Sequence, residues 1–224
     1  MSDDFKHRMA QWIPSHVSPQ VLVGIYTILA RISYIKGSVR KDHKSANIDK
    51  LKSEGSPLKD GFIENQSAWK GVLFGKVDMA YSGCEIMAVY NILHALGRET
   101  GPELIGELIE SFEKNGAALK GRIGSSPKAI RAHLKKRGIN TRLIWKEDDI
   151  DESVDKAIVT YYNNKESLYH QIHTVAFIKE EAGFVPHNAR SRQRAYPSLK
   201  EAIHGVGSDP KVICIIEIIE TANL

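Results

Sequence analysis

The chain has 224 residues, of which 42% are hydrophobic and 26% are charged, and its formal net charge is +4. These values are typical of a globular protein with one sizeable core, and they do not support nucleic-acid binding, which favours a strongly basic balance. The two cysteines lie far apart in the sequence, so they indicate neither a disulfide framework nor a zinc knuckle. We therefore expect a reducing, cytoplasmic compartment.

Residues 1–60 are expected to form an N-terminal helical segment followed by a polar linker. The opening residues lack an apolar run behind a basic head, unlike a secretory signal. The apolar stretch 21–35 is too short and too polar for stable membrane insertion. A helix that packs on the domain is favoured there over a membrane-surface or partner-binding helix. Residues 36–60 are polar and rich in lysine, which indicates a surface connection.

Residues 61–224 are expected to form one domain that begins with helices. From Cys84 to Leu96 apolar residues occur on all sides of the predicted helix, which indicates that this helix is buried. Residues 101–116 carry a proline in the first turn and apolar residues at helical spacing. A third helix is predicted to start at Ser126-Pro127, because serine caps helices and proline fits the first helical position.

After Gly138 the pattern changes to short apolar runs, which predict consecutive strands. The runs are NTRLIW, AIVTYY, IHTVAFI, GFVPH and VICIIEII, with KEEAG as a hairpin turn between the third and the fourth. A short helix is expected at 198–205, before the last strand. Helices followed by a block of strands predict an α+β fold, in which the buried Cys84 helix packs on a mostly antiparallel sheet.

Three residues in this layout have the chemistry of a thiol-based acyl transfer. Cys84 follows a Ser-Gly turn and begins a helix, where unpaired N–H groups and the helix dipole stabilise a thiolate. His173 begins a predicted strand and is the candidate base, while Asn188 ends the next strand and is the candidate partner that orients the imidazole. The two strands are joined by a tight turn, so we expect His173 and Asn188 to lie side by side.

Other residues of the same types have less support as site residues. Cys214 lies in the middle of an apolar strand and is expected to be buried and inert. His170 and His187 are close to His173 in sequence, but His187 precedes the asparagine and should point to the opposite face of its strand. A zinc site built from Cys84 and these histidines is weakly supported, because no close cysteine or histidine pair accompanies Cys84. We expect no metal and no cofactor.

From about Phe74 to Asn188 the chain resembles the papain-like cysteine peptidase superfamily, in particular the bacteriocin-leader-processing (double-glycine) peptidases and their relatives. The resemblance rests on the Gly83-Cys84 turn with its apolar helix, the helix at Ser126-Pro127, and the strands that carry His173 and Asn188. It implies a papain-like fold and a Cys-His-Asn triad that forms an acyl-enzyme. It covers roughly half of the chain.

The chain departs from the family pattern at two positions. The family has a glutamine six residues before the cysteine, which donates to the oxyanion, and this chain has Asp78 there. Asp78 is therefore the candidate for the oxyanion region, although an ionised carboxylate would repel an oxyanion. The glycine that usually follows the cysteine is replaced by Glu85.

These patterns predict a thiol hydrolase, specifically a cysteine peptidase-like enzyme that acts on a peptide or on a small amide or thioester. Two alternatives stay open at this point. One is an acyl or amide transferase with the same triad, in which an amine replaces water as the acceptor. The other is a catalytically inactive papain-like binding module, which is suggested by Asp78 at the oxyanion position. The patterns specify neither a particular substrate sequence nor an oligomeric state.

Overall fold

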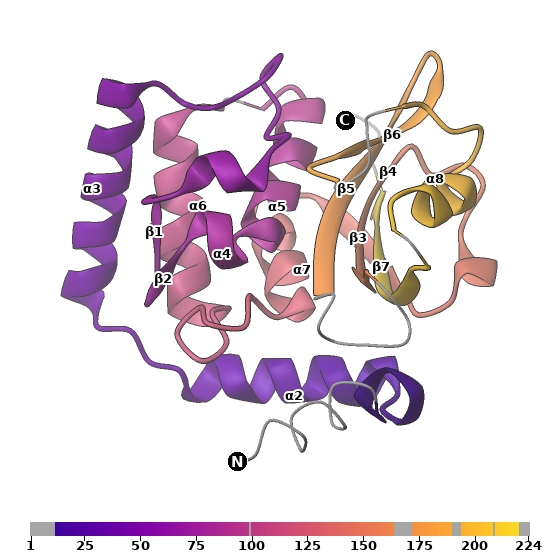
Figure 1. Cartoon of the computed structure of the whole chain (residues 1–224), viewed down its shortest axis with the longest axis horizontal. Helices are drawn as coiled ribbons and strands as arrows, with labels where there is room; N and C mark the ends of the chain where they lie inside the picture. The colour runs from indigo at the N-terminus through magenta and orange to yellow at the C-terminus, as the bar shows by residue number, and fades with distance from the viewer. Residues whose placement is uncertain (1–11, 99, 164–171, 190–193, 208, 220–224) are drawn as a thin grey trace.

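The computed structural model describes residues 12–98, 100–163, 172–189, 194–207 and 209–219. Most of its helices lie on one side of an antiparallel β-sheet, and α8 (Leu199–Gly205) covers the opposite side of the sheet (Figure 1). This is the α+β arrangement that the order of the elements predicts. The short helix expected at 198–205 is α8.

In the described part of the chain the main sheet has five strands, all of which the sequence predicts. They are β3 (Asn140–Ile144), β4 (Lys156–Tyr162), β5 (Ile172–Glu180), β6 (Gly183–His187) and β7 (Lys211–Ile219). Their order across the sheet is β3-β7-β4-β5-β6, and each neighbouring pair is antiparallel. β5 and β6 form a hairpin in which Glu180 pairs with Gly183. The start of β5 and the end of β6 therefore lie at the same end of the sheet.

The sheet is buried on both faces, which explains the nearly continuous apolar runs in its strands. Ile158, Ala176 and Ile216 belong to the core on the α5 side of the sheet. Their sequence neighbours Val159, Phe177 and Ile215 belong to the core on the α8 side. Alternate residues of a strand point to opposite faces, so each strand contributes to both cores.

The three helices predicted after residue 61 are α5 (Cys84–Ala95), α6 (Pro102–Asn115) and α7 (Pro127–Lys136). All residues from Cys84 to Leu93 are buried, and α5 packs directly against β5. The side chain of Ser126 accepts a hydrogen bond from Lys128 N at the start of α7, as expected of a capping serine. The buried position of α5 brings its first residue to the end of the sheet where β5 begins.

The prediction of a polar linker at 36–60 is wrong, because most of this segment forms the 18-residue helix α3 (Gly37–Glu54). Its apolar residues are sparse, so helical periodicity is hard to recognise in the sequence. Its stability comes from packing on α6, where a Cβ on Gly106 would lie 2.8 Å from Ile48 Cγ1. Asn47 adds two hydrogen bonds to the backbone of Leu73, at 2.9 and 2.7 Å.

The helix expected in the apolar stretch 21–35 is α2 (Pro19–Ile32), which is capped by Ser18. It runs along one edge of the molecule, below the other helices and the sheet in Figure 1. Leu22 and Val23 pack with Ile213 and Cys214 of β7. Leu51 of α3 joins the core that contains α5. The described part of the N-terminal segment is therefore packed against the rest of the fold.

Short elements lead the chain into α5 and connect the strands. Before Cys84 these are η1 (Gln66–Trp69), β1 (Leu73–Phe74), β2 (Val77–Asp78) and α4 (Met79–Ser82), and η2 (Glu147–Asp149) follows β3. β1 and β2 form a separate two-stranded ribbon. The short elements before Cys84 position the start of α5.

Candidate active site

Gly83 makes the tight turn that places Cys84 at the first position of α5. α4 ends at Ser82 and α5 begins at Cys84, so a single residue separates the two helices. A Cβ on Gly83 would lie 2.7 Å from Met79 O and 2.9 Å from Met79 Cα, both of which are backbone atoms. Any side chain would push the two turns apart, and the cysteine would move with them.

Cys84, His173 and Asn188 line the same cavity, which has a volume of about 690 Å³. Cys84 comes from the start of α5, His173 from the second position of β5, and Asn188 follows the last residue of β6. All three are at least nine-tenths buried. Further walls come from Tyr26 of α2, Gln66 of η1 and the loop before α7. The structure thus brings the three triad candidates together.

The imidazole of His173 is held by the backbone of Asn188. His173 Nε2 lies 2.7 Å from the carbonyl oxygen of Asn188. A carbonyl only accepts hydrogen bonds, so Nε2 carries the proton, and in the neutral ring Nδ1 is then an acceptor. The side-chain amide of Asn188 instead donates to Met87 Sδ at 3.5 Å. Asn188 therefore orients the ring through its main chain.

Asn188 can do this because the chain turns sharply at the end of β6. Its φ is +64°, in the left-handed region, which asparagine tolerates better than most residues. The carboxylate of Glu64 supports the turn by accepting from Asn188 N at 3.1 Å and by contacting His187 Nδ1 at 2.8 Å. The His187 ring stacks on Phe62, with ring centroids 4.0 Å apart, and is not part of the cavity wall.

The Cys84 thiol donates a hydrogen bond to Glu85, the next residue. The distance from Cys84 Sγ to Glu85 Oε2 is 3.4 Å. Burial raises the pKa of Cys84 well above its ordinary value, and the charge of Glu85 raises it further, although hydrogen bonds from Thr174 act in the opposite direction. Contrary to the expectation from the helix start alone, burial and Glu85 raise the pKa of Cys84, which favours the thiol form.

Glu85 is itself a buried acid, and the backbone of the loop before α7 lies against its carboxylate. Burial raises its pKa from 4.5 to about 7. Glu85 Oε1 accepts a hydrogen bond from Ser125 N at 3.0 Å. Gly124 has a φ of +83°, and a Cβ there would lie 2.6 Å from Glu85 Oε1. The loop before α7 therefore needs glycine at this position to leave room for the carboxylate.

Asp78, the residue predicted for the oxyanion region, does not line the cavity, although its sequence neighbours Ala80 and Tyr81 do. Its carboxylate accepts from Tyr81 N and from Gly71 N, each at 3.0 Å, so it caps α4 and ties α4 to the preceding turn. It is not among the described residues that line the cavity. Gln66 does line the cavity, and its amide donates to Met79 O and Ala80 O at 3.2 Å.

The described residues contain no cluster of three or more histidine, cysteine, aspartate or glutamate side chains that could hold a metal ion. His170, one of the histidines considered for a zinc site, lies outside the described residues. Cys214 is fully buried in β7, and burial raises its pKa to about 12, as expected of a core cysteine.

Sequence reasoning missed three residues of this region: Glu64, Gln66 and the role of Glu85. Glu64 reaches Asn188 across 124 positions of sequence, and no local pattern encodes such a contact. Glu85 gave one signal, because a charged residue among the apolar residues of a buried helix requires a partner or a function.

In comparisons with known proteins, no family model, no curated protein and no solved structure matches the chain.

Proposed function

We propose that this protein is a papain-like thiol hydrolase of the cysteine peptidase type, with Cys84 as the nucleophile and His173 as the acid and base. The observation that carries the proposal is the cavity that Cys84 shares with His173 and Asn188, at the start of a buried helix packed on an antiparallel sheet. The resemblance to bacteriocin-leader-processing peptidases assigns the same three residues. The substrate class is a peptide, or a small amide or thioester.

The hydrogen bond of His173 supports its proposed role in the first chemical step. With Nε2–H donating to the Asn188 carbonyl, Nδ1 accepts the proton of Cys84 as the sulfur attacks the carbonyl carbon of the substrate. The imidazolium then protonates the leaving amine or thiol, and an acyl-enzyme remains on Sγ. Water, deprotonated by His173, hydrolyses this thioester and regenerates the thiol. An amine in place of water would give the transferase reaction.

The oxyanion of the tetrahedral intermediate requires donors near Cys84 Sγ. The first turn of α5 supplies them, because the N–H groups of the first helical turn have no partner within the helix. Asp78 is committed to the cap of α4 and Gln66 donates to two carbonyls, so neither is assigned this role. The backbone of α5 thus takes the part that a side-chain amide has in the family.

One observation favours the alternative of an inactive binding module. Burial and the Glu85 carboxylate raise the pKa of Cys84, so the sulfur is a weaker nucleophile than an activated catalytic cysteine. When Glu85 is protonated, it places no negative charge beside the thiolate. Activity in the proposed enzyme is therefore linked to the protonation state of Glu85.

A covalent probe distinguishes the two functions. A peptidyl acyloxymethyl ketone, which alkylates catalytic cysteines, is incubated with the full chain and the adduct is located by mass spectrometry. The proposed enzyme is labelled at Cys84, Cys214→Ala is labelled equally, and Cys84→Ala is not labelled. His173→Gln lowers the labelling rate by about 100-fold or more, as expected of a member of a catalytic unit. Equal labelling of the wild type and His173→Gln, with no peptide turnover, identifies the inactive module.

A further inference from the structure

α2 has two apolar faces, and within the described part of the chain only one of them is covered. The covered face includes the buried residues Leu22, Val23 and Ala30. The other face carries a stripe of exposed residues, which we call the α2 stripe: Val21, Ile25, Ile28 and Ile32. These four are spaced by four, three and four positions, so they form one line along the helix. Their exposed fractions are 55%, 44%, 60% and 69% in chain order.

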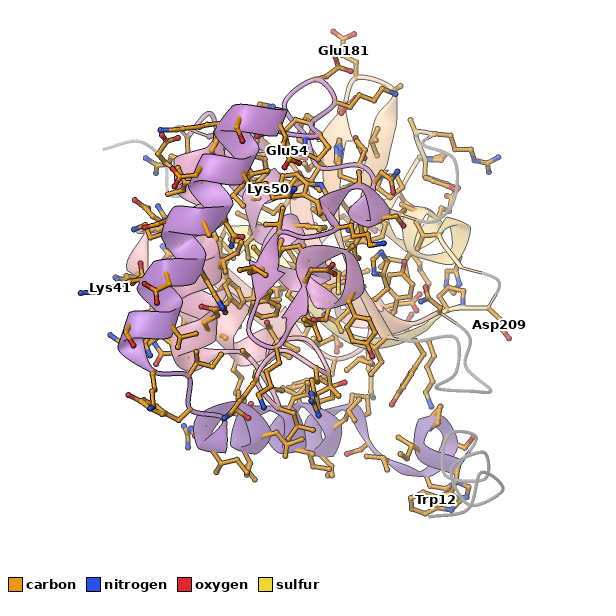
Figure 2. All side chains as sticks on the ribbon, turned by 60° about the vertical axis from the view of Figure 1, so that its left-hand side comes forward. Trp12, Lys41, Lys50, Glu54, Glu181 and Asp209 are labelled. Atoms are coloured by element: carbon orange, nitrogen blue, oxygen red, sulfur yellow. The ribbon has the colours of Figure 1, made fainter. Side chains whose placement is uncertain are left out.

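The α2 stripe lies on the outside of the molecule. α2 runs along one edge of the fold in Figure 1, and in Figure 2 a row of side chains projects from its lower side, away from the sheet and the other described helices. An exposed aromatic residue lies beyond each end of the helix in the sequence, with Trp12 48% exposed and Tyr34 69% exposed. A monomeric soluble protein rarely exposes a contiguous apolar surface of this kind without a binding role.

The same part of the chain carries positive charge only. Between Trp12 and Lys41 the sequence contains four basic residues and no acidic residue, although the whole chain has 27 acidic residues. Arg31 is exposed in the last turn of α2, Lys36 is exposed directly before α3, and Lys41 is exposed in α3, where Figure 2 labels it. An apolar stripe bordered by cations is complementary to a surface that is apolar inside and anionic at its border.

We propose that α2 docks on an anionic membrane surface, with the α2 stripe buried at the level of the lipid headgroups and Arg31 and Lys36 in contact with them. Trp and Tyr at the ends of the stripe suit this position, because their rings favour the membrane interface. The stripe is a convex ridge, so it fits a deformable lipid surface. Within the described residues no single helix is long and apolar enough to cross a bilayer.

Docking through α2 would hold the candidate active site close to the membrane. Tyr26 belongs to α2 and lines the cavity that contains Cys84. Burial raises the pKa of Tyr26, and the nearby Glu85 and Cys84 raise it further, so the helix and the site are in electrostatic contact. The docking proposal itself does not depend on the proposed enzymatic function, since the α2 stripe faces away from the cavity wall.

Sedimentation with vesicles tests the proposal. The full chain is mixed with vesicles of phosphatidylcholine and phosphatidylserine, or of phosphatidylcholine alone, and the bound fraction is measured. We expect binding to the mixed vesicles and a loss of binding in high salt. Ile28→Ser lowers the partition coefficient by about tenfold or more, since it removes most of a buried aliphatic side chain. Arg31→Gln and Lys36→Gln each lower it by about fivefold.

The matched control is Ile219→Ser, which removes the same side chain from a half-exposed position at the end of β7. It should bind vesicles like the wild type. Equal loss in Ile28→Ser and Ile219→Ser, or no binding by the wild type, overturns the proposal. Sedimentation velocity tests the alternative that a second copy of the chain binds the α2 stripe. A wild-type dimer that Ile28→Ser converts to a monomer, without vesicle binding, would show that a second copy covers the stripe.

Discussion

Replacing Glu85 with glutamine removes a buried charge beside the Cys84 thiol and keeps the shape of the side chain. In the folded chain the pKa of Glu85 is about 7, whereas its ordinary value is 4.5. The folded protein therefore binds more protons than the unfolded chain between these two pH values. Below about pH 4.5 the Glu85 carboxyl is protonated in both states and does not lower the free energy of unfolding. As the pH rises to about 7, ionisation of this buried carboxyl increasingly lowers that free energy.

The size of this effect follows from the pKa difference. A rise from 4.5 to about 7 corresponds to about 3 kcal/mol of unfolding free energy, at roughly 1.4 kcal/mol per pKa unit. Glutamine does not ionise, so Glu85→Gln lacks this pH-dependent loss. Relative to the wild type, the variant should gain about 3 kcal/mol between about pH 4 and pH 8.

Urea unfolding of both proteins at the two pH values measures the gain. The matched control is Glu110→Gln, which removes a carboxylate from a partly exposed position on α6 where it pairs with Lys44. We expect the control to change by less than about 0.5 kcal/mol between the same pH values. If Glu85→Gln shows no larger pH-dependent gain than the control, Glu85 is not a buried acid with a raised pKa, and the description of the site is wrong.

The same variant tests the effect of Glu85 on the thiol. Removing a negative charge 3.4 Å from Cys84 Sγ favours the thiolate. The thiolate of a more acidic thiol is intrinsically less nucleophilic, which offsets part of the gain in thiolate fraction. The net increase in the rate of alkylation by iodoacetamide at about pH 8 is therefore between about threefold and thirtyfold. Cys214 provides the internal reference. An unchanged or lower rate at Cys84 would show that the carboxylate assists the thiol.

Substitutions at three further positions test the framework around the site. Gly124→Ala should lower the unfolding free energy by about 1 to 3 kcal/mol in urea titrations, since alanine is strained at a φ of +83° and crowds Glu85; wild-type stability would show that the loop adapts. Asp78→Ala should lower it by about 1 kcal/mol through loss of the α4 cap, while Asp78→Asn retains most of it; equal stability of the two would refute the capping role. Glu64→Ala should lower the turnover of the proposed enzyme by about tenfold or more while Cys84 stays in place, because the Asn188 turn loses its support; undiminished turnover would show that this turn holds without it.

The sequence predicts most of the fold because its patterns are local. The strands after Gly138 are recognised from short apolar runs bounded by turns, and α6 and α7 from proline at the first helical position followed by regular apolar spacing. α3 was missed for a physical reason. Its stability depends on the groove left by Gly106 and on two hydrogen bonds of Asn47 with the backbone of Leu73, and neither is visible in its own residues.

The candidate site was predictable as far as its residues belong to regular elements. His173 and Asn188 were placed together by recognising a hairpin, and Cys84 by recognising the start of a buried helix. The hydrogen bond that orients the imidazole comes from the backbone of Asn188 and not from its amide, and this depends on the left-handed turn at that residue. Glu64, which holds the turn, belongs to a distant loop. Contacts of this kind require the assembled fold.

The surroundings of Glu85 are too specific for an incidental buried charge. The loop before α7 adopts a left-handed backbone at Gly124 that leaves space for the carboxylate, and Ser125 N is directed at one of its oxygens. The other oxygen accepts a hydrogen bond from the Cys84 thiol. At neutral pH this arrangement opposes both folding and thiolate formation, so stability alone does not explain it. Ionisation of Glu85 adds to burial in raising the pKa of Cys84, so the reactivity of the thiol should depend on the protonation state of this carboxylate.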